Sequence, residues 1–222
     1  MEIPKKQAAK YDVDNLAEAF GIQAVDECRM LAEWLNTTTE LCDYERETIE
    51  TLRQKLIKSG SNWNEEELKI QFIGILLFIA NIDEDRKIKT FFERSLSATV
   101  RDIPLSVIAD CVIASPKGLG GSPRSPYFFL QEYKKSKGDK QDRNVGPPEG
   151  QMLTAMIISQ ELNQDDQPLY GCWIVGSNWH FTVLNGVEYC VSRQFDATRE
   201  PDLLQIVFIL RNLKTLILAR LK

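Results

Sequence analysis

The spacing of apolar residues divides the chain into a helical first part and a mixed second part. Helical periodicity over 15–35 and 39–60 predicts two helices, and neither contains a recognisable site. We expect residues 1–60 to form a helical region that acts as a cap or as a surface for homodimer formation. Residues 61–222 would then form a single α/β domain.

The second part begins with the pattern helix, strand, strand, strand. The first of these helices has Asn64 as a candidate N-cap and three glutamates in its first turn. β-Branched and aromatic residues over 88–114 predict two strands, with Asp102 and Pro104 marking the turn between them. A loop rich in Gly, Pro and Ser then leads to a strand over 127–133.

The pattern continues with a helix, a strand, a hairpin and a last helix. The first helix is entered through Pro147 and Pro148, and the hairpin turns at Asn185 and Gly186. The final helix covers 201–222. This order of elements predicts a mixed sheet flanked by helices.

The charge balance limits the classes of partner. The formal net charge is -5 and the pI is near 5.1, which argues against nonspecific binding to nucleic acid. The acidity belongs mainly to residues 1–60, which contain 8 Lys and Arg against 12 Asp and Glu. The rest of the chain is close to neutral.

Cysteine and histidine usage exclude several kinds of site. The five cysteines are widely scattered without a C-x-x-C spacing, as is typical of a protein in a reducing cytosol. The N-terminus lacks the apolar stretch of a secretory signal, and no apolar run is long enough for a membrane helix, so we expect a cytoplasmic protein. The single histidine, His180, rules out a His-rich metal centre. We interpret it as a partly buried side chain packed beside Trp179 rather than as the centre of a hydrolase.

Two carboxylates and an amine mark the candidate chemistry. Asp110 interrupts an otherwise apolar strand, and Glu132 and Lys134 lie two apart at the end of the next strand, so they share one face of it. A half-buried carboxylate needs a partner, and two carboxylates with a backbone carbonyl such as that of Tyr133 provide the oxygen ligands that Mg²⁺ prefers. Lys134 would hold or help to deprotonate an attacking water.

This arrangement, from about 64 to 193, resembles the PD-(D/E)xK nuclease-like superfamily, whose motif places an Asp on one strand and a (D/E)xK tripeptide on the next. The resemblance implies a restriction-endonuclease-like αβββαβ core. It also matches Glu65, early in the first core helix, and Gln151, in the helix after the motif, to residues that many members carry. Ala109 stands where the motif has proline.

The resemblance implies a metal-dependent nuclease. Asp110 and Glu132 would bind Mg²⁺ or Mn²⁺, and the substrate would be DNA or RNA. A basic loop could follow the phosphate backbone beside the metal. Its residues are Lys135, Lys137, Lys140 and Arg143.

Each of these residues also has a purely structural interpretation. Asp110 and Lys134 could form an ion pair between neighbouring strands. Glu65 could serve only the helix dipole, Gln151 could merely begin a helix, and the basic loop could be a solvated hairpin end. The chain would then be an inactive nuclease-like fold that binds nucleic acid or protein. A second ExK, ending at Lys69, falls on a helix, where positions two apart do not share a face.

Overall fold

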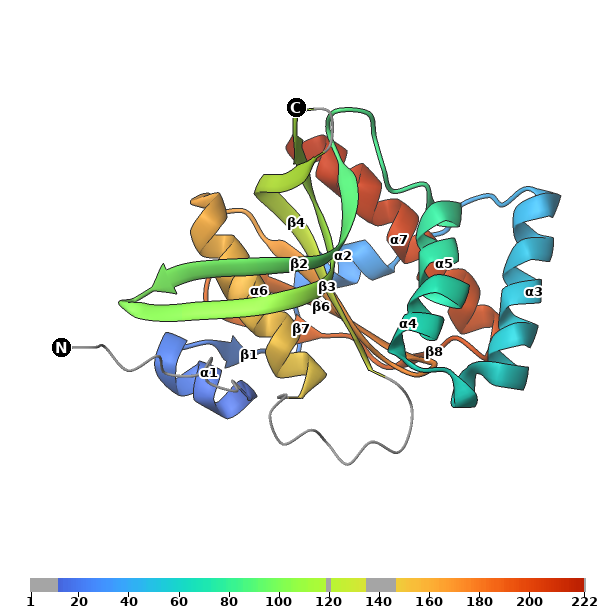
Figure 1. Cartoon of the computed structure of the whole chain (residues 1–222), viewed down its shortest axis with the longest axis horizontal. Coiled ribbons are helices and arrows are strands. Elements are labelled where there is room, and N and C mark those ends of the chain that lie inside the picture. The colour runs from blue at the N-terminus through green and yellow to red at the C-terminus, as the bar shows by residue number, and fades with distance from the viewer. Residues whose placement is uncertain (1–11, 119–120, 135–146, 222) are drawn as a thin grey trace.

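The computed structural model describes residues 12–118, 121–134 and 147–221, and these form a central sheet with helices on both faces (Figure 1). The strands are β1 (Gln23–Ala24), β2 (Lys89–Val100), β3 (Ile103–Lys117), β4 (Ser122–Lys134), β5 (Leu169–Val175), β6 (Asn178–Asn185), β7 (Glu188–Val191) and β8 (Phe195–Asp196). The helices are α1 (Val13–Phe20), α2 (Arg29–Leu35), α3 (Asp43–Ser59), α4 (Glu65–Leu68), α5 (Gly74–Ala80), α6 (Pro148–Asn163) and α7 (Glu200–Arg220). A 3₁₀ turn, η1 (Gly60–Asn62), follows α3, and a π-helical turn, η2 (Lys69–Ile73), joins α4 to α5.

The sheet is mixed and open. Its strand order is β1-β7-β6-β5-β4-β3-β2, and β8 pairs with β6. Within the described residues, β4 runs parallel to β5 and β1 runs parallel to β7, while the other neighbours are antiparallel. The predicted α/β class with a mixed sheet flanked by helices is therefore confirmed. The finer restriction-endonuclease-like assignment stays a prediction.

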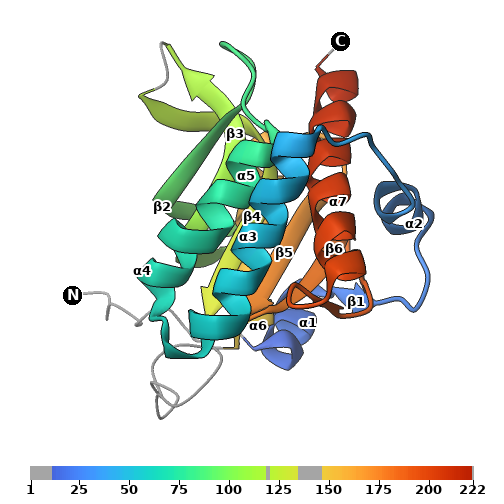
Figure 2. The same cartoon turned by 90° about the vertical axis from the view of Figure 1, so that its right-hand side faces the viewer.

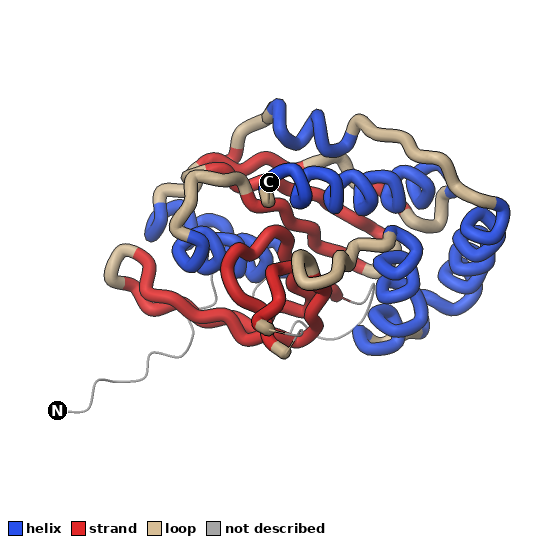
Figure 3. Tube along the Cα trace, turned by 90° about the horizontal axis from the view of Figure 1, so that it is seen from above, coloured by secondary structure: helices blue, strands red, loops and turns tan. Residues whose placement is uncertain are grey.

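Two apolar cores lie on opposite faces of the sheet. One core contains buried side chains of α2, α3, α5 and α7, and Figure 2 shows α3, α5 and α7 side by side. The other core contains side chains of α1 and α6. Seen from above, helices lie on both sides of the strands (Figure 3). Strand alternation explains the division, because neighbouring β4 residues Phe129 and Leu130 belong to different cores.

The first sixty residues contribute to both cores. The expected single helix over 15–35 is wrong, because Gly21 adopts a left-handed φ of 66° and ends α1. The chain then adds β1 to the sheet before α2 begins. Trp34 of α2 is fully buried, donates its Nε1–H to the Ile209 carbonyl of α7 at 3.0 Å, and packs edge-on against Phe129.

The apolar sides of α2 and α3 are thus turned onto the chain's own sheet and α7. Side chains that remain exposed on α3 include Tyr44 and Ile57, at 73% and 50% of their full surface. A homodimer through the N-terminal helices stays a prediction, and it would have to use such exposed residues. Within the described part of the chain, no helix has both the length and the apolarity needed to cross a membrane.

Two predicted turns are found in the structure, whereas one predicted loop is mostly strand. β2 and β3 form a long hairpin that turns at Arg101 and Asp102, both with positive φ, and it projects to one side of the molecule (Figure 1). Gly186 takes a left-handed φ of 60° in the predicted β6–β7 turn. The predicted loop over 115–126 is mostly strand, because β3 and β4 continue to pair as far as Lys117 and Ser122.

Candidate active site

The candidate site lies where β3 and β4 stop pairing. The last paired residues on this side are Cys111 and Gln131, although β4 continues to Lys134 along its other neighbour, β5. Beyond that point the Asp110 side chain replaces the missing backbone pairing between β3 and β4, because its Oδ2 accepts a hydrogen bond from the backbone N–H of Tyr133 at 2.7 Å. A carboxylate that accepts a hydrogen bond from a backbone N–H in this way is fixed in place. The same hydrogen bond also fixes the direction of its second oxygen.

Glu132 and Lys134 meet on one side of β4, as their spacing predicts. The Lys134 Nζ lies 2.8 Å from Glu132 Oε1 and 3.8 Å from Glu65 Oε1. Glu132 is only 4% exposed. Glu65 opens α4 next to the Asn64 cap, so the first turn of that helix delivers a third carboxylate to the same lysine. The structure therefore brings together four of the five predicted site residues.

The electrostatics of this group are dominated by burial. Burial raises the pKa of Glu132 to about 8, and the neighbouring Asp110 carboxylate adds to that rise. Burial also raises the pKa of Asp110, by more than the Tyr133 N–H and the field of Lys134 lower it. Glu132 thus pairs with Lys134, while the Asp110 carboxyl lies in the fields of both Lys134 and Lys69. The ionised forms of both carboxyls would be stabilised by a further cation.

Lys134 remains an ammonium group in these surroundings. Burial lowers its pKa, but the contacts with Glu132 and Glu65 outweigh burial, so the pKa is raised overall. A lysine with a raised pKa donates hydrogen bonds and supplies positive charge, and it is a poor general base at neutral pH.

A second lysine, Lys69, was missed because it lies on a helix. Its Nζ forms an ion pair with Glu66 at 2.8 Å and another with Glu93, and only 8% of its side chain is exposed. Burial lowers its pKa, but these two glutamates outweigh burial and raise the pKa to about 12. The Nζ also lies 5.9 Å from the centre of the Tyr133 ring. The available sequence signal was the charge of Lys69 within the apolar run around Ile70 and Phe72.

Glu93 was also missed, because nothing in its local sequence distinguishes it. It lies inside β2 with a left-handed φ of 51°. The pairs on either side, Phe92 with Cys111 and Arg94 with Ala109, place Glu93 opposite Asp110. Its side chain turns to Lys69, so β2 as well as α4 reaches the candidate site.

Other predicted residues are not brought to the group. Gln151 is partly exposed in the first turn of α6, and no hydrogen bond or ion pair among the described residues joins its side chain to the site. Glu67 closes the capping box with Asn64, each side chain accepting the other's backbone N–H at 2.8 Å. The predicted nucleic-acid-binding residues lie outside the described residues, and they are Lys135, Lys137, Lys140 and Arg143.

His180 is a packed side chain, as predicted, but with a different neighbour. Its ring stacks on Trp173 at 4.9 Å between centroids and 8° between planes. Trp179 is fully buried on the opposite side of β6, in the other core. Burial lowers the pKa of His180, so the ring is neutral at pH 7.

The side chains around the candidate site limit which metal ions could bind there. Among the described residues, no group of three or more His, Cys, Asp or Glu side chains is close enough together to hold a metal ion. A closed zinc site is therefore not supported here. Mg²⁺ and Mn²⁺ commonly take one or two carboxylates and keep several waters, and Asp110 and Glu132 supply two carboxyl groups of that kind.

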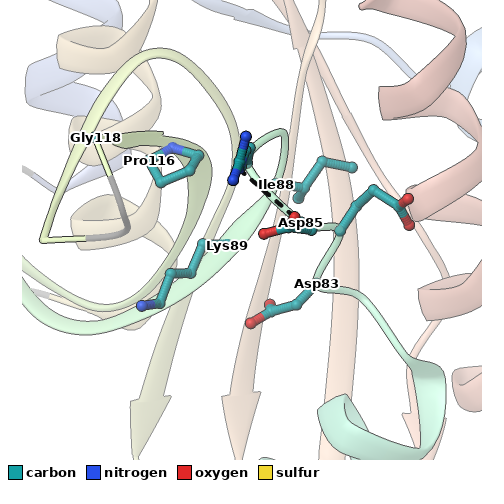
Figure 4. Close-up of a pocket in the computed structure, with 8 residues that line it drawn as sticks. Asp83, Asp85, Ile88, Lys89, Pro116 and Gly118 are labelled. Atoms are coloured by element: carbon teal, nitrogen blue, oxygen red, sulfur yellow. Dashed lines mark ion pairs between the residues drawn. The ribbon is translucent and has the colours of Figure 1, made fainter.

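A separate pocket of about 200 Å³ lies between the loop before β2 and the end of β3 (Figure 4). Asp83, Asp85, Lys89 and Pro116 are among the residues that line it, and none of the predicted site residues does. Asp83 Oδ1 accepts both the backbone N–H and the hydroxyl of Thr90, at 2.8 and 2.7 Å. These bonds hold the loop against β2.

Comparison with known proteins adds no family assignment. Neither a scan against models of protein families nor a search of curated proteins finds a match for this chain. The function must therefore be inferred from the geometry of the site.

Proposed function

We propose that this protein is a divalent-metal-dependent nuclease that hydrolyses phosphodiester bonds of DNA or RNA. The observation that supports it best is the meeting of Asp110, Glu132 and Lys134 at the point where β3 and β4 separate. A purely structural ion pair needs only one carboxylate. A second, buried carboxyl whose pKa is raised to about 8 is costly to ionise and typical of a functional site.

In this proposal each residue has a distinct role. Asp110 and Glu132 would hold Mg²⁺ or Mn²⁺, which when bound would activate water and stabilise negative charge on the phosphate. Lys134 would donate a hydrogen bond that orients the attacking water, because its raised pKa keeps it protonated. Glu65 would hold Lys134 in position from α4, at the 3.8 Å separation already described.

Cleavage assays with matched variants test the proposal. Plasmid, single-stranded DNA and RNA are incubated with Mg²⁺, Mn²⁺ or a chelator, and with wild type, Asp110→Ala, Lys134→Ala and Lys55→Ala. Lys55 of α3 is the control, because its amino group lies over the Trp63 ring, outside the site. We expect the two site variants to lose at least about 100-fold in rate. The control should keep the wild-type rate.

Two results would contradict the proposal. Cleavage that survives both site substitutions would place the activity elsewhere or in a contaminant. Failure of wild type to cleave all three substrates, together with failure to bind Mn²⁺ in a calorimetric titration, would exclude a metal-dependent nuclease.

A second candidate is a nuclease-like fold without activity that binds nucleic acid or protein. It is favoured by the lack of a three-residue metal group within the described residues, and by the ion pairs that already satisfy Lys134. The titration separates the two candidates. A metal site should bind Mn²⁺ and lose that binding on Asp110→Ala, whereas a binding module should show no such binding.

A further inference from the structure

The hairpin of β2 and β3 changes its alternation at the candidate site. On β3, Leu105 and Ala109 pack into the core beside α6, and so do Val112 and Ala114. Odd-numbered residues therefore face α6 before Asp110, and even-numbered residues face it afterwards. A regular strand keeps one parity throughout.

The neighbouring strand, β2, shows the same change of alternation at the position opposite Asp110. Phe91 and Leu96 of β2 both face α6, although they differ in parity. Between them lies Glu93, with its left-handed φ of 51°. This conformation is strained for an ordinary residue but not for glycine, so something must compensate for it.

The contact available to compensate for it is the ion pair with Lys69. Glu93 reaches Lys69 from the kinked backbone, and Lys69 is fixed by its burial and by its place at the start of η2. In that turn the Lys69 carbonyl accepts the N–H of Gly74, five residues on. A single π-helical turn inside a helix often occurs at a functional site.

The kink has a consequence for Asp110. Because Glu93 breaks the ladder opposite it, Asp110 is the one residue of β3 between Ile103 and Ala114 without a paired partner on β2. It is then free to turn its carboxylate toward the N–H of Tyr133. A flat hairpin would place Asp110 in regular alternation instead.

We propose that the Lys69–Glu93 ion pair is a clamp that holds this kink and so positions Asp110 for metal binding. Lys69 and Glu93 are thus positioning residues, and their role rests on the proposed function. The clamp joins η2 to β2, so the Asp110 carboxylate is set by two elements that carry none of the proposed metal ligands.

Substituting glycine for Glu93 distinguishes a positioning role of the clamp from mere relief of backbone strain. Glu93→Gly accepts φ 51° without a steric penalty but cannot reach Lys69. We expect it to keep or raise Tm while weakening Mn²⁺ binding about tenfold. A residue with a merely structural role would move both quantities in the same direction.

Lys69 and Glu66 complete the experiment. Lys69→Met should weaken Mn²⁺ binding by a similar factor, Lys69→Arg should restore most of it, and Glu93→Gly with Lys69→Met should cost no more than either alone. Glu66→Gln is the matched control, because Glu66 also pairs with Lys69 but is on the helix and 65% exposed in its side chain. It should change Mn²⁺ binding less than twofold.

A second measurement does not need the metal. Hydrogen exchange at the Tyr133 amide reports the bond to Asp110 directly, and we expect it to become faster in Glu93→Gly and Lys69→Met but not in Glu66→Gln. Unchanged exchange and Mn²⁺ affinity in Glu93→Gly, while Asp110→Ala abolishes binding, would overturn the clamp and leave the proposed function intact. Wild type that binds no Mn²⁺ would overturn both.

Discussion

Glu132 should make the metal-free protein less stable as pH rises. Burial and the neighbouring Asp110 raise the pKa of this carboxyl from its ordinary value of 4.5 to about 8. Between these two pH values the folded protein keeps a proton that the unfolded chain has lost. The free energy of unfolding therefore falls as pH rises through this window, because the folded state binds more protons.

The size of the effect follows from the two pKa values. They differ by about 3.5, and each pKa unit corresponds to about 1.4 kcal/mol, which gives about 5 kcal/mol at pH 8 and above. Glu132→Gln removes the ionisable group and keeps its shape. The variant should match wild type near pH 4.5 and exceed its stability by up to about 5 kcal/mol near pH 8.5.

Urea denaturation in chelator-containing buffer measures this difference at several pH values. The exposed Glu161→Gln is the control, and it should show no such trend. A difference between Glu132→Gln and wild type that is flat from pH 4.5 to 8.5, or that grows toward acid, would refute the reasoning. Saturating Mn²⁺ should restore stability to wild type at high pH and leave Glu132→Gln unchanged, because only the wild type keeps both proposed ligands.

Three further outcomes are expected. Asp110→Ala should lower the free energy of unfolding by about 1–3 kcal/mol in urea titrations, because it leaves a backbone N–H without its acceptor. Trp34→Phe removes the hydrogen bond to the Ile209 carbonyl and should cost about 1–3 kcal/mol, with unchanged cleavage per folded molecule. His180→Phe should keep cleavage within twofold of wild type, because the ring stacks on Trp173 and, within the described part of the chain, its side chain has no hydrogen bond or ion pair with the predicted site residues. A large loss would make His180 a candidate catalytic residue.

Much of the fold could be predicted from local signals. The Asn64 capping box, the turn at Gly186 and the strand carrying Glu132 follow from side-chain chemistry within a few residues. Gly21 was the exception, because the helical periodicity on both of its sides is equally good. There the left-handed glycine, and pairing of β1 with distant β7, override the periodic pattern.

The site was only partly predictable, for a physical reason. Asp110, Glu132 and Lys134 are recognisable because strand spacing fixes which of them share a side. Glu93 and Lys69 are recognisable only in three dimensions, because their importance comes from a backbone kink and from a contact between residues 24 apart. Neither the left-handed φ of Glu93 nor the burial of Lys69 has a local sequence signature.

The buried Trp34 side chain has a practical consequence for anyone shortening the chain. It lies against Phe129, three residues before Glu132 on the same strand, and it ties that strand to the last helix. A fragment beginning at residue 61 would remove the indole hydrogen bond to α7 and leave a hole about the size of an indole behind β4. Fragments designed for crystallisation or binding studies should therefore retain α2.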